Sequence, residues 1–520
     1  MLGGTKIANN FKENDSFPLF DTEKSCGYGK HKKLLRPQKS KTTFNNTTFS
    51  LQSCNMLNRS LAVAFLLSNI YTAHCRKRQD MQQASDGYDY FQHYPKQYVA
   101  KRVGRKNGGV ATFFLNKLDG DPDTKEEWKT VPYSEAFVDI TGEPENPKGP
   151  EPGCDTVMKM LYDDQYLYVA AKMQYAGRPI IAKFEEENDP IYQKDSDFEV
   201  FVDMHGTCHA YKELELNAWN VTWNLMLNRP YADGGAEFSG RVTEPRNNKT
   251  HPKYWGPEKQ RTFTKLRKGQ VNGNASDVAE YTTEIALSWA DLLDRTPQGG
   301  GASGVVVAQD SCNNIEGSTS TTTTPAGTTS TKQESSSSQL PRWIRINFSR
   351  VEDQGDKNWV WSPMITYDAS KRDFRGFVDM HRPEAWGYVY LDDATSSAEG
   401  DADHAESVQN STSGSSTSPV AQGPPQDPSF PVRLVAAHLY YAQRAYKDAR
   451  NGTHFATSLS ELRPYTHPDD AFLEPFEIEI LSSLSGSFTV KVTDLNRGWK
   501  ASIDESRLML VESIRSEFTC

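Results

Sequence analysis

Two neighbouring segments, residues 197–203 and 211–217, alternate acidic or polar side chains with apolar ones. Since successive side chains of a β-strand point to opposite faces of the sheet, each segment predicts a strand with one polar face. Paired as a hairpin, the two strands bring their polar faces together. The carboxylates and the amide expected on this face are Glu199, Glu213, Glu215 and Asn217. Such a face suits a hydroxyl-rich ligand or a cation.

Further strands are predicted around this hairpin, with turn signals between them. Residues 157–162 and 166–171 form another hairpin across Asp163-Asp164-Gln165, and residues 281–287 precede a helical turn at Trp289–Leu293. Two more strands are expected at residues 343–348 and 386–391. Short strands with few long helices indicate an all-β fold, and we predict a β-sandwich over about residues 110–393.

Composition divides the rest of the chain. Residues 296–340 are rich in Gly, Thr and Ser and are interpreted as a low-complexity loop insertion between two strands of one sheet. Residues 394–429 are interpreted as a linker. Residues 430–520 form a small α+β region, with a helix over 431–449 and strands at residues 476–480, 488–492 and 508–511.

The N-terminal quarter bears on the compartment. Residues 1–55 are polar, have no hydrophobic period and are interpreted as disordered. Residues 56–75 combine a short basic start, an apolar stretch and small residues, which is typical of a secretory signal peptide that begins at Met56. A buried core helix and an uncleaved signal anchor are the alternatives, and the sequence leaves the start at Met1 or Met56 open. We therefore expect a secreted, extracellular protein.

Two further features bear on secretion. Triplets of the type Asn-x-Ser/Thr, the acceptors of N-glycosylation, begin at Asn220, Asn248, Asn274, Asn347, Asn410 and Asn451. Cys154 and Cys208 flank predicted strands and could pair in an oxidising compartment, or they could be unpaired buried thiols.

Composition and spacing exclude several classes of function. Lys+Arg 58 against Asp+Glu 68 leaves no basic excess for a nucleic-acid partner. No run of 18 apolar residues predicts a stable membrane span. The histidines show no H-E-x-x-H spacing for zinc. Met380 and His381 are adjacent and cannot take both axial positions of one haem iron, so haem is not expected. A nucleotide cofactor is not expected either.

A series of motifs, in order, resembles the family 9 carbohydrate-binding modules, and in particular their divergent family-9-like group. The motifs include residues 159–168, 195–201, 213–220, 228–235, 284–289, 345–350, 359–363 and 380–389. The resemblance covers about residues 115–392, with 296–340 as an insertion of this chain.

The resemblance implies a secreted, calcium-associated β-sandwich that binds a polysaccharide or oligosaccharide. Relatives of this kind hold the sugar between two tryptophans. Tyr192 stands near the position of the first tryptophan, and Met380-His381 occupies the place of the second. No calcium ligand can be assigned to a residue of this chain from the resemblance.

Candidate saccharide-binding residues follow from the polar face and from aromatic rings expected to flank it, because a pyranose packs its C–H face on a flat ring. They are Tyr192, Glu199, Glu215, Asn217, Trp223 and Trp361. Glu199 and Glu215 could instead be a glycosidase pair, or acceptors of hydrogen bonds from Arg345 or Arg350. No catalytic residue is assigned.

Three functions remain open on the sequence. The first is a secreted, non-catalytic saccharide-binding protein, with a role in polysaccharide catabolism. A secreted glycoside hydrolase or accessory enzyme is the second, although residues 430–520 are few for a hydrolase domain. The third is a structural cell-surface protein whose β-sandwich has lost sugar binding.

Overall fold

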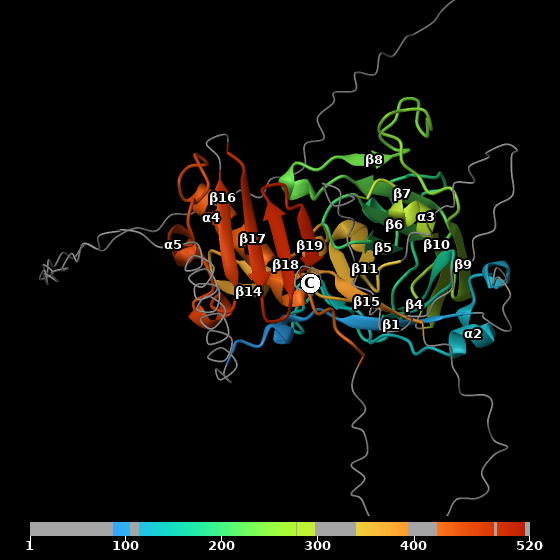
Figure 1. Ribbon diagram of the computed structural model, residues 1–520. Coiled ribbons are helices and arrows are strands. Elements are labelled where there is room, and N and C mark those ends of the chain that lie inside the picture. Colours follow the sequence, from blue (N-terminus) through green and yellow to red (C-terminus); the bar gives the residue numbers. More distant parts are fainter. Residues whose placement is uncertain are drawn as a thin grey trace, which may run out of the picture. The chain divides into compact units, whose positions relative to one another are not determined.

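The computed structural model describes residues 87–103, 114–276, 278–296, 340–393, 424–482 and 486–514, all of which belong to one compact unit, residues 78–520 (Figure 1). The expectations for residues 1–55, for the signal-like segment 56–75 and for most of the insertion and linker lie outside these residues. Among the helices that are described, none is long and apolar enough to cross a membrane.

A 13-stranded mixed sheet dominates the described part of the chain. Its strands are β1 (Gln97–Arg102), β2 (Val138–Asp139), β3 (Thr156–Tyr162), β4 (Tyr166–Tyr175), β5 (Asp197–Asp203), β6 (Tyr211–Asn217), β7 (Thr222–Leu227), β8 (Glu237–Ser239), β9 (Arg261–Lys268), β10 (Ala279–Ser288), β11 (Trp343–Glu352), β12 (Lys357–Val360) and β15 (Gly387–Asp392). Their order is β8-β7-β6-β5-β11-β15-β1-β3-β4-β10-β9, and β12 joins β11 to β2.

The sheet curls on itself. Apolar side chains of β5 and β6, such as Val200 and Leu214, belong to the same buried cluster as Val169 of β4 and Ile285 of β10, although these strands lie far apart in the strand order. The prediction of a mostly β fold with a packed interior is therefore confirmed. The fold differs from the predicted sandwich of two separate sheets. Strand β1 pairs in parallel with both β15 and β3, and this pairing joins the two halves of the curled sheet into one hydrogen-bonded sheet.

Most predicted strands of the sheet are present, and several were missed. The hairpins β3–β4 and β5–β6, the strand β10 with its following helix α3 (Trp289–Leu293), and the strands β11 and β15 match the expected segments. Strand β9 escaped prediction because it is an edge strand whose side chains are largely solvent-accessible, which leaves no apolar alternation to detect.

A second, smaller sheet is formed by the C-terminal region. Its strands are β16 (Glu477–Ser482), β17 (Phe488–Asp494), β18 (Trp499–Asp504) and β19 (Met509–Ser513), all antiparallel. The helix α4 (Phe430–Asp448) packs on this sheet through residues such as Val435 and Leu439. The sequence predicted α4 and three of the four strands. Strand β18 escaped prediction.

Short elements complete the described residues. The remaining strands and α-helices are β13 (Ile365–Asp368), β14 (Asp373–Gly376), α2 (Glu126–Lys129) and α5 (Leu459–Leu462). The 3-10 turns are η1 (Tyr90–His93), η2 (Leu115–Lys117), η3 (Pro122–Thr124), η4 (Ile191–Gln193), η5 (Tyr231–Asp233), η6 (Asp353–Gly355), η7 (Pro383–Ala385), η8 (Arg463–Tyr465) and η9 (Asp470–Phe472).

Cys154 and Cys208 are free, buried thiols, so the disulfide considered from the sequence does not form. Cys154 lies in the interior of the curled sheet, whereas Cys208 belongs to the core of the C-terminal region. The two cysteines therefore serve different cores as small apolar residues.

Candidate functional site

Strands β5 and β6 place four carboxylates on one face of the large sheet. Glu199 lies opposite Glu215 in the antiparallel register, and Phe201 lies opposite Glu213. Phe198, Val200 and Val202 enter the interior core on the other face. The polar face predicted from the alternation is thus confirmed, and Asp197 belongs to it as well.

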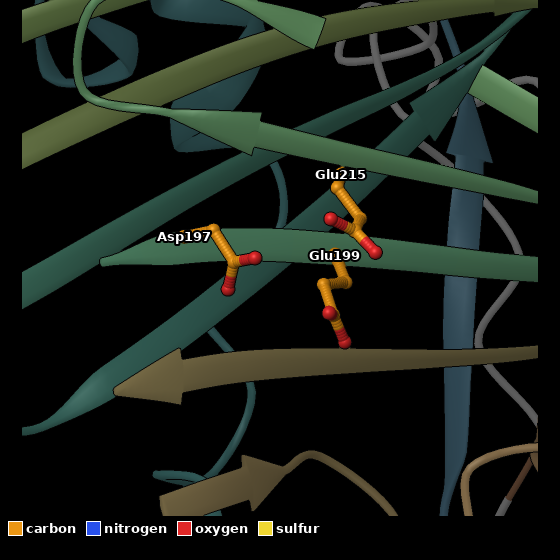
Figure 2. A group of neighbouring side chains, drawn as sticks. All are labelled: Asp197, Glu199 and Glu215. Carbon is orange, nitrogen blue, oxygen red and sulfur yellow. The ribbon is translucent and has the colours of Figure 1, made fainter. Parts of the chain in front are cut away.

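Three of these carboxylates form a tight cluster, which we call the acidic triad: Asp197, Glu199 and Glu215 (Figure 2). One oxygen from each lies within 4.8 Å of the others, and all three side chains are buried. Their hydrogen bonds are few: Asp197 Oδ1 accepts from the backbone N–H of Val351 (3.0 Å), and Glu215 Oε2 accepts from that of Tyr192 (3.1 Å). The triad could hold a metal ion.

Two buried carboxylate oxygens at this face have no hydrogen-bond partner among the described residues: Asp197 Oδ2 and Glu213 Oε2. A buried charge without a partner is costly, so such a group binds a proton, a cation or a ligand. Oxygen-only donors of this kind are the ligands that Ca²⁺ and Mg²⁺ prefer.

Burial shifts the acidity of the whole group. Burial raises the pKa of Glu199 to about 7, although a hydrogen bond with Ser349 lowers this pKa in part. It raises the pKa values of Asp197, Glu213 and Glu215 well above their usual range, and repulsion from the neighbouring carboxylates adds to the effect. Without a cation, the folded protein therefore retains protons here that an exposed carboxyl would release.

Aromatic side chains flank the carboxylates and form what we call the aromatic row: Tyr192, Trp223, Tyr231 and His381. Tyr192 and Trp223 stack with ring centroids 6.2 Å apart, and Tyr231 meets His381 edge to face at 4.6 Å. The hydroxyl of Tyr211 on β6 lies 3.0 Å from His381 Nδ1 and ties this ring to the sheet. Tyr231 is the most accessible ring of the row, at 42%.

Arg241 covers one ring of the aromatic row. Its guanidinium lies 4.9 Å from the Trp223 ring centroid and forms an ion pair with Glu237. The Trp223 side chain is only 5% exposed, and Arg241 covers its ring in this conformation. Tyr231 is exposed, and Tyr192 and His381 are partly exposed, so solvent reaches these three rings of the row.

Two residues predicted for the site, Asn217 and Trp361, make contacts that do not involve a ligand. Asn217 has a structural part: its Oδ1 accepts from the backbone N–H groups of Trp219 and Val221, and its Nδ2 donates to Asp195. Trp361 is 1% exposed and packs in the interior core, so it does not flank the polar face.

The position of Trp361 has a specific cause. Its ring lies over Gly387 so closely that a Cβ there would be 2.3 Å from it, which explains a residue without a side chain at the start of β15. Trp361 directly follows strand β12, and Trp359 in that strand is buried too.

The expected arginine partners of the carboxylates lie elsewhere. Arg350 forms an ion pair with Glu352, and Arg345 donates to the carbonyl oxygens of Trp386 and Glu384. The interpretation of Glu199 and Glu215 as acceptors for these arginines is therefore wrong, and no arginine in the described part of the chain forms an ion pair with the acidic triad.

Sequence reasoning missed four residues of the site: Asp197, Tyr231, Glu237 and Arg241. The strand period places Asp197 on the face of Glu199, although Asp197 is not among the candidate saccharide-binding residues. The other three lie on or beside the short strand β8 and its preceding loop, whose position beside β7 is not visible in the local pattern.

Comparisons with known proteins give distant structural matches. No protein-family model matches the chain, and no curated protein does. Among solved structures, a candidate carbohydrate-binding protein from Bacteroides uniformis aligns with 57% of this chain and all of its own, at 11% identity and a TM-score of 0.31. A family 9 carbohydrate-binding module from Caldicellulosiruptor kristjanssonii, solved with cellotriose and with glucose, aligns with 59% of this chain and all of its own, at 12% identity and a TM-score of 0.26. Similarity at this level is too distant to assign a function.

The raised pKa of Glu199 predicts a pH dependence of stability. Because its folded value of about 7 exceeds its ordinary 4.5, the folded state binds more protons than the unfolded chain between these values. The free energy of unfolding contributed by Glu199 therefore falls as pH rises through this window, by up to about 1.4 kcal/mol per pH unit. Denaturant unfolding from pH 4.5 to 7.5, in chelator, measures it.

Glu199→Gln is the comparison, because the amide does not titrate. The difference between wild type and variant cancels the opposite contribution of buried histidines such as His381, whose pKa burial lowers to about 4. We expect wild type to lose stability relative to Glu199→Gln as pH rises. Parallel profiles for the two proteins would contradict the prediction.

Proposed function

We propose that this protein is a non-catalytic saccharide-binding protein, and that the aromatic row with Glu213 and Glu237 is its binding site. The observation that carries the proposal is the presence, on one sheet face, of accessible aromatic rings beside a carboxylate oxygen of Glu213 that has no partner in the described residues. Saccharide recognition requires both features. The resemblance of the sequence motifs to family 9 carbohydrate-binding modules supports the same function.

Each group has a part in the proposed binding. The C–H face of a pyranose packs on Tyr231 or Tyr192, which replaces water over the ring by apolar contact. Sugar hydroxyls accept from the Arg241 guanidinium. Glu213 Oε2 is buried in this conformation and has no partner among the described residues, so a hydroxyl that displaces the side chains above it would give this oxygen a hydrogen-bond partner.

We propose calcium as the cation of the acidic triad. The residues fit it: all donors are carboxylate oxygens, and among the residues that the structure describes Asp197 Oδ2 has no hydrogen-bond partner and no arginine pairs with the triad. Three carboxylates supply up to six oxygens, which is within the range of calcium coordination. The ion would neutralise part of the buried charge beneath the binding face.

The glycosidase alternative is less well supported by this geometry. Glycoside hydrolysis requires two carboxyl groups that reach opposite sides of a glycosidic bond. Glu199 and Glu215 are only 4% and 2% exposed, and they lie in the same buried cluster. Their arrangement suits a cation better than a substrate.

The binding proposal predicts that Tyr231→Ala and Tyr192→Ala weaken saccharide binding by about 1–3 kcal/mol, on the scale of nucleic-acid bases stacked on aromatic side chains. A glycan array identifies the oligosaccharide, and isothermal titration calorimetry measures the variants. Trp219→Ala is the matched control, because Trp219 is a 53% exposed ring that is not part of the aromatic row. Equal loss in the control, or none in either tyrosine variant, would contradict the proposed site.

The cation proposal predicts that Ca²⁺ raises the thermal midpoint of wild type at pH 7.5, and that chelator reverses the rise, since a ligand that binds only the folded state stabilises it. Glu215→Gln should reduce this response strongly. Glu237→Gln, an acid of the same face outside the triad, should keep it. An unchanged midpoint in wild type over millimolar Ca²⁺ would rule out a calcium site here.

We also propose secretion, with a role in polysaccharide catabolism. The support is the signal-like segment 56–75 and the exposed sequon residues Asn274 and Asn451. N-terminal sequencing of protein made in a secretory host should find an end near residues 74–80. An intact N-terminus retained inside the cell would count against the proposal.

A further inference from the structure

Two loops carry the outer rings of the aromatic row. The β7–β8 loop contains Tyr231 and, two residues on, Asp233, within η5. The loop before β15 contains His381 and, three residues on, Glu384, within η7. Neither acidic residue belongs to the binding face, yet both are buried.

Both acids are bound by the C-terminal region. Asp233 forms an ion pair with Arg507 Nε at 2.9 Å and another with Arg444 at 3.2 Å, and it accepts a hydrogen bond from the Tyr440 hydroxyl. Glu384 forms an ion pair with Arg507 Nη1 at 3.0 Å. It also accepts a hydrogen bond from the hydroxyl of the next tyrosine, Tyr441.

Arg507 is the one group in these contacts that reaches both loops. It lies in the turn between β18 and β19, with φ of 65°, and its side chain is almost wholly buried. Its guanidinium is 4.9 Å from the Tyr440 ring centroid and 5.6 Å from that of Tyr441. A planar guanidinium offers several donors in a rigid fork, so it fixes two carboxylates at a set separation.

We infer that the C-terminal region is a positioning element of the saccharide site, and that Arg507 sets the separation of Tyr231 and His381 by holding Asp233 and Glu384. This inference rests on the proposed function for the meaning of the two rings. The geometry that it describes does not depend on the ligand: one buried side chain of the second sheet holds two loops of the first.

Arg433 offers a matched control. It is an arginine of α4 in the same region, and its Nη1 donates to the carbonyl oxygen of Gly206 at 2.7 Å. The β5–β6 loop that contains Gly206 carries no member of the aromatic row. Loss of Arg433 therefore weakens the attachment of the C-terminal region without releasing the loops of Tyr231 or His381.

The first test is hydrogen exchange of the full chain, which requires no saccharide. In Arg507→Met, amides of residues 229–235 and 379–386 should exchange at least tenfold faster, while those of 204–209 keep their wild-type rates. Arg433→Met should show the reverse pattern. Unchanged exchange in both loops, or faster exchange confined to residues 424–514, would overturn the inference.

A second variant covers the case in which Arg507→Met does not fold. Asp233→Asn keeps the size of the side chain and removes only one charge of the bridge. It should raise exchange in residues 229–235 and leave 379–386 near wild-type rates. Equal effects on both loops, or on neither, would contradict separate attachment through Arg507.

The second test is saccharide affinity, measured with the oligosaccharide selected on the array. Arg507→Met should weaken binding about tenfold or more, and Arg433→Met less than twofold. In a Tyr231→Ala background the effect of Arg507→Met should shrink to a few-fold, because one positioned ring is gone. A full tenfold effect in that background would show that Arg507 does not act through Tyr231.

The two tests separate the inference from the proposed function. If wild type binds no saccharide on the array, the proposed function fails, and the exchange pattern still decides whether Arg507 holds both loops. If wild type binds and the exchange pattern is absent, the positioning by Arg507 fails while the binding function stands.

Discussion

The central constraint of this structure is the burial of four carboxylates on the β5–β6 face, which no arginine or lysine of the described residues neutralises. Asp197, Glu199, Glu213 and Glu215 are all buried, and two of their oxygens have no partner in the described part of the chain. Buried charge of one sign is costly unless protons, a cation or a ligand compensate it. The fold tolerates it because the opposite face of the same strands packs tightly into the interior core. A polar face of this kind is a cost to stability, which is the usual sign of a functional surface.

A second group of buried charges shows the contrasting solution. Around Arg507, each acid has a partner: Asp233 and Glu384 are paired with the same guanidinium and receive hydrogen bonds from tyrosines. A buried ion-pair network of this kind is poor evidence for high stability. It does fix the geometry of its members, because moving or removing one of them leaves a buried charge without its partner. The two groups are therefore complementary. The acids of the β5–β6 face have no ion-pair partner among the described residues, whereas the acids around Arg507 are ion-paired and so hold the loops around it.

The sequence predicted the parts of the site that depend on local periodicity. The strand period assigned Glu199 and Glu215 to one face correctly, since alternation within β5 and β6 determines the side on which they lie. Trp361 was expected to flank the polar face, but it directly follows β12, donates its backbone N–H to the carbonyl oxygen of Phe348 and packs its ring in the core. Asn217 lies on the predicted face, but its amide serves the β6–β7 turn. Residue type indicates which chemistry is available, but tertiary pairing decides whether a side chain is free to perform it.

Tyr231 and Arg507 could not be predicted as parts of the site, and the reason is topological. The rings of the aromatic row come from segments that span about 190 residues, from Tyr192 to His381, and Arg507 lies more than 100 residues beyond the last of them. Local patterns carry no information about such pairings, which arise because β8 is added at one edge of the large sheet and the β18–β19 turn meets the loops beside it. The C-terminal region could be regarded as a separate module from its composition. Its buried ion pairs with Asp233 and Glu384 argue instead that the geometry of the binding face is shared between the two sheets.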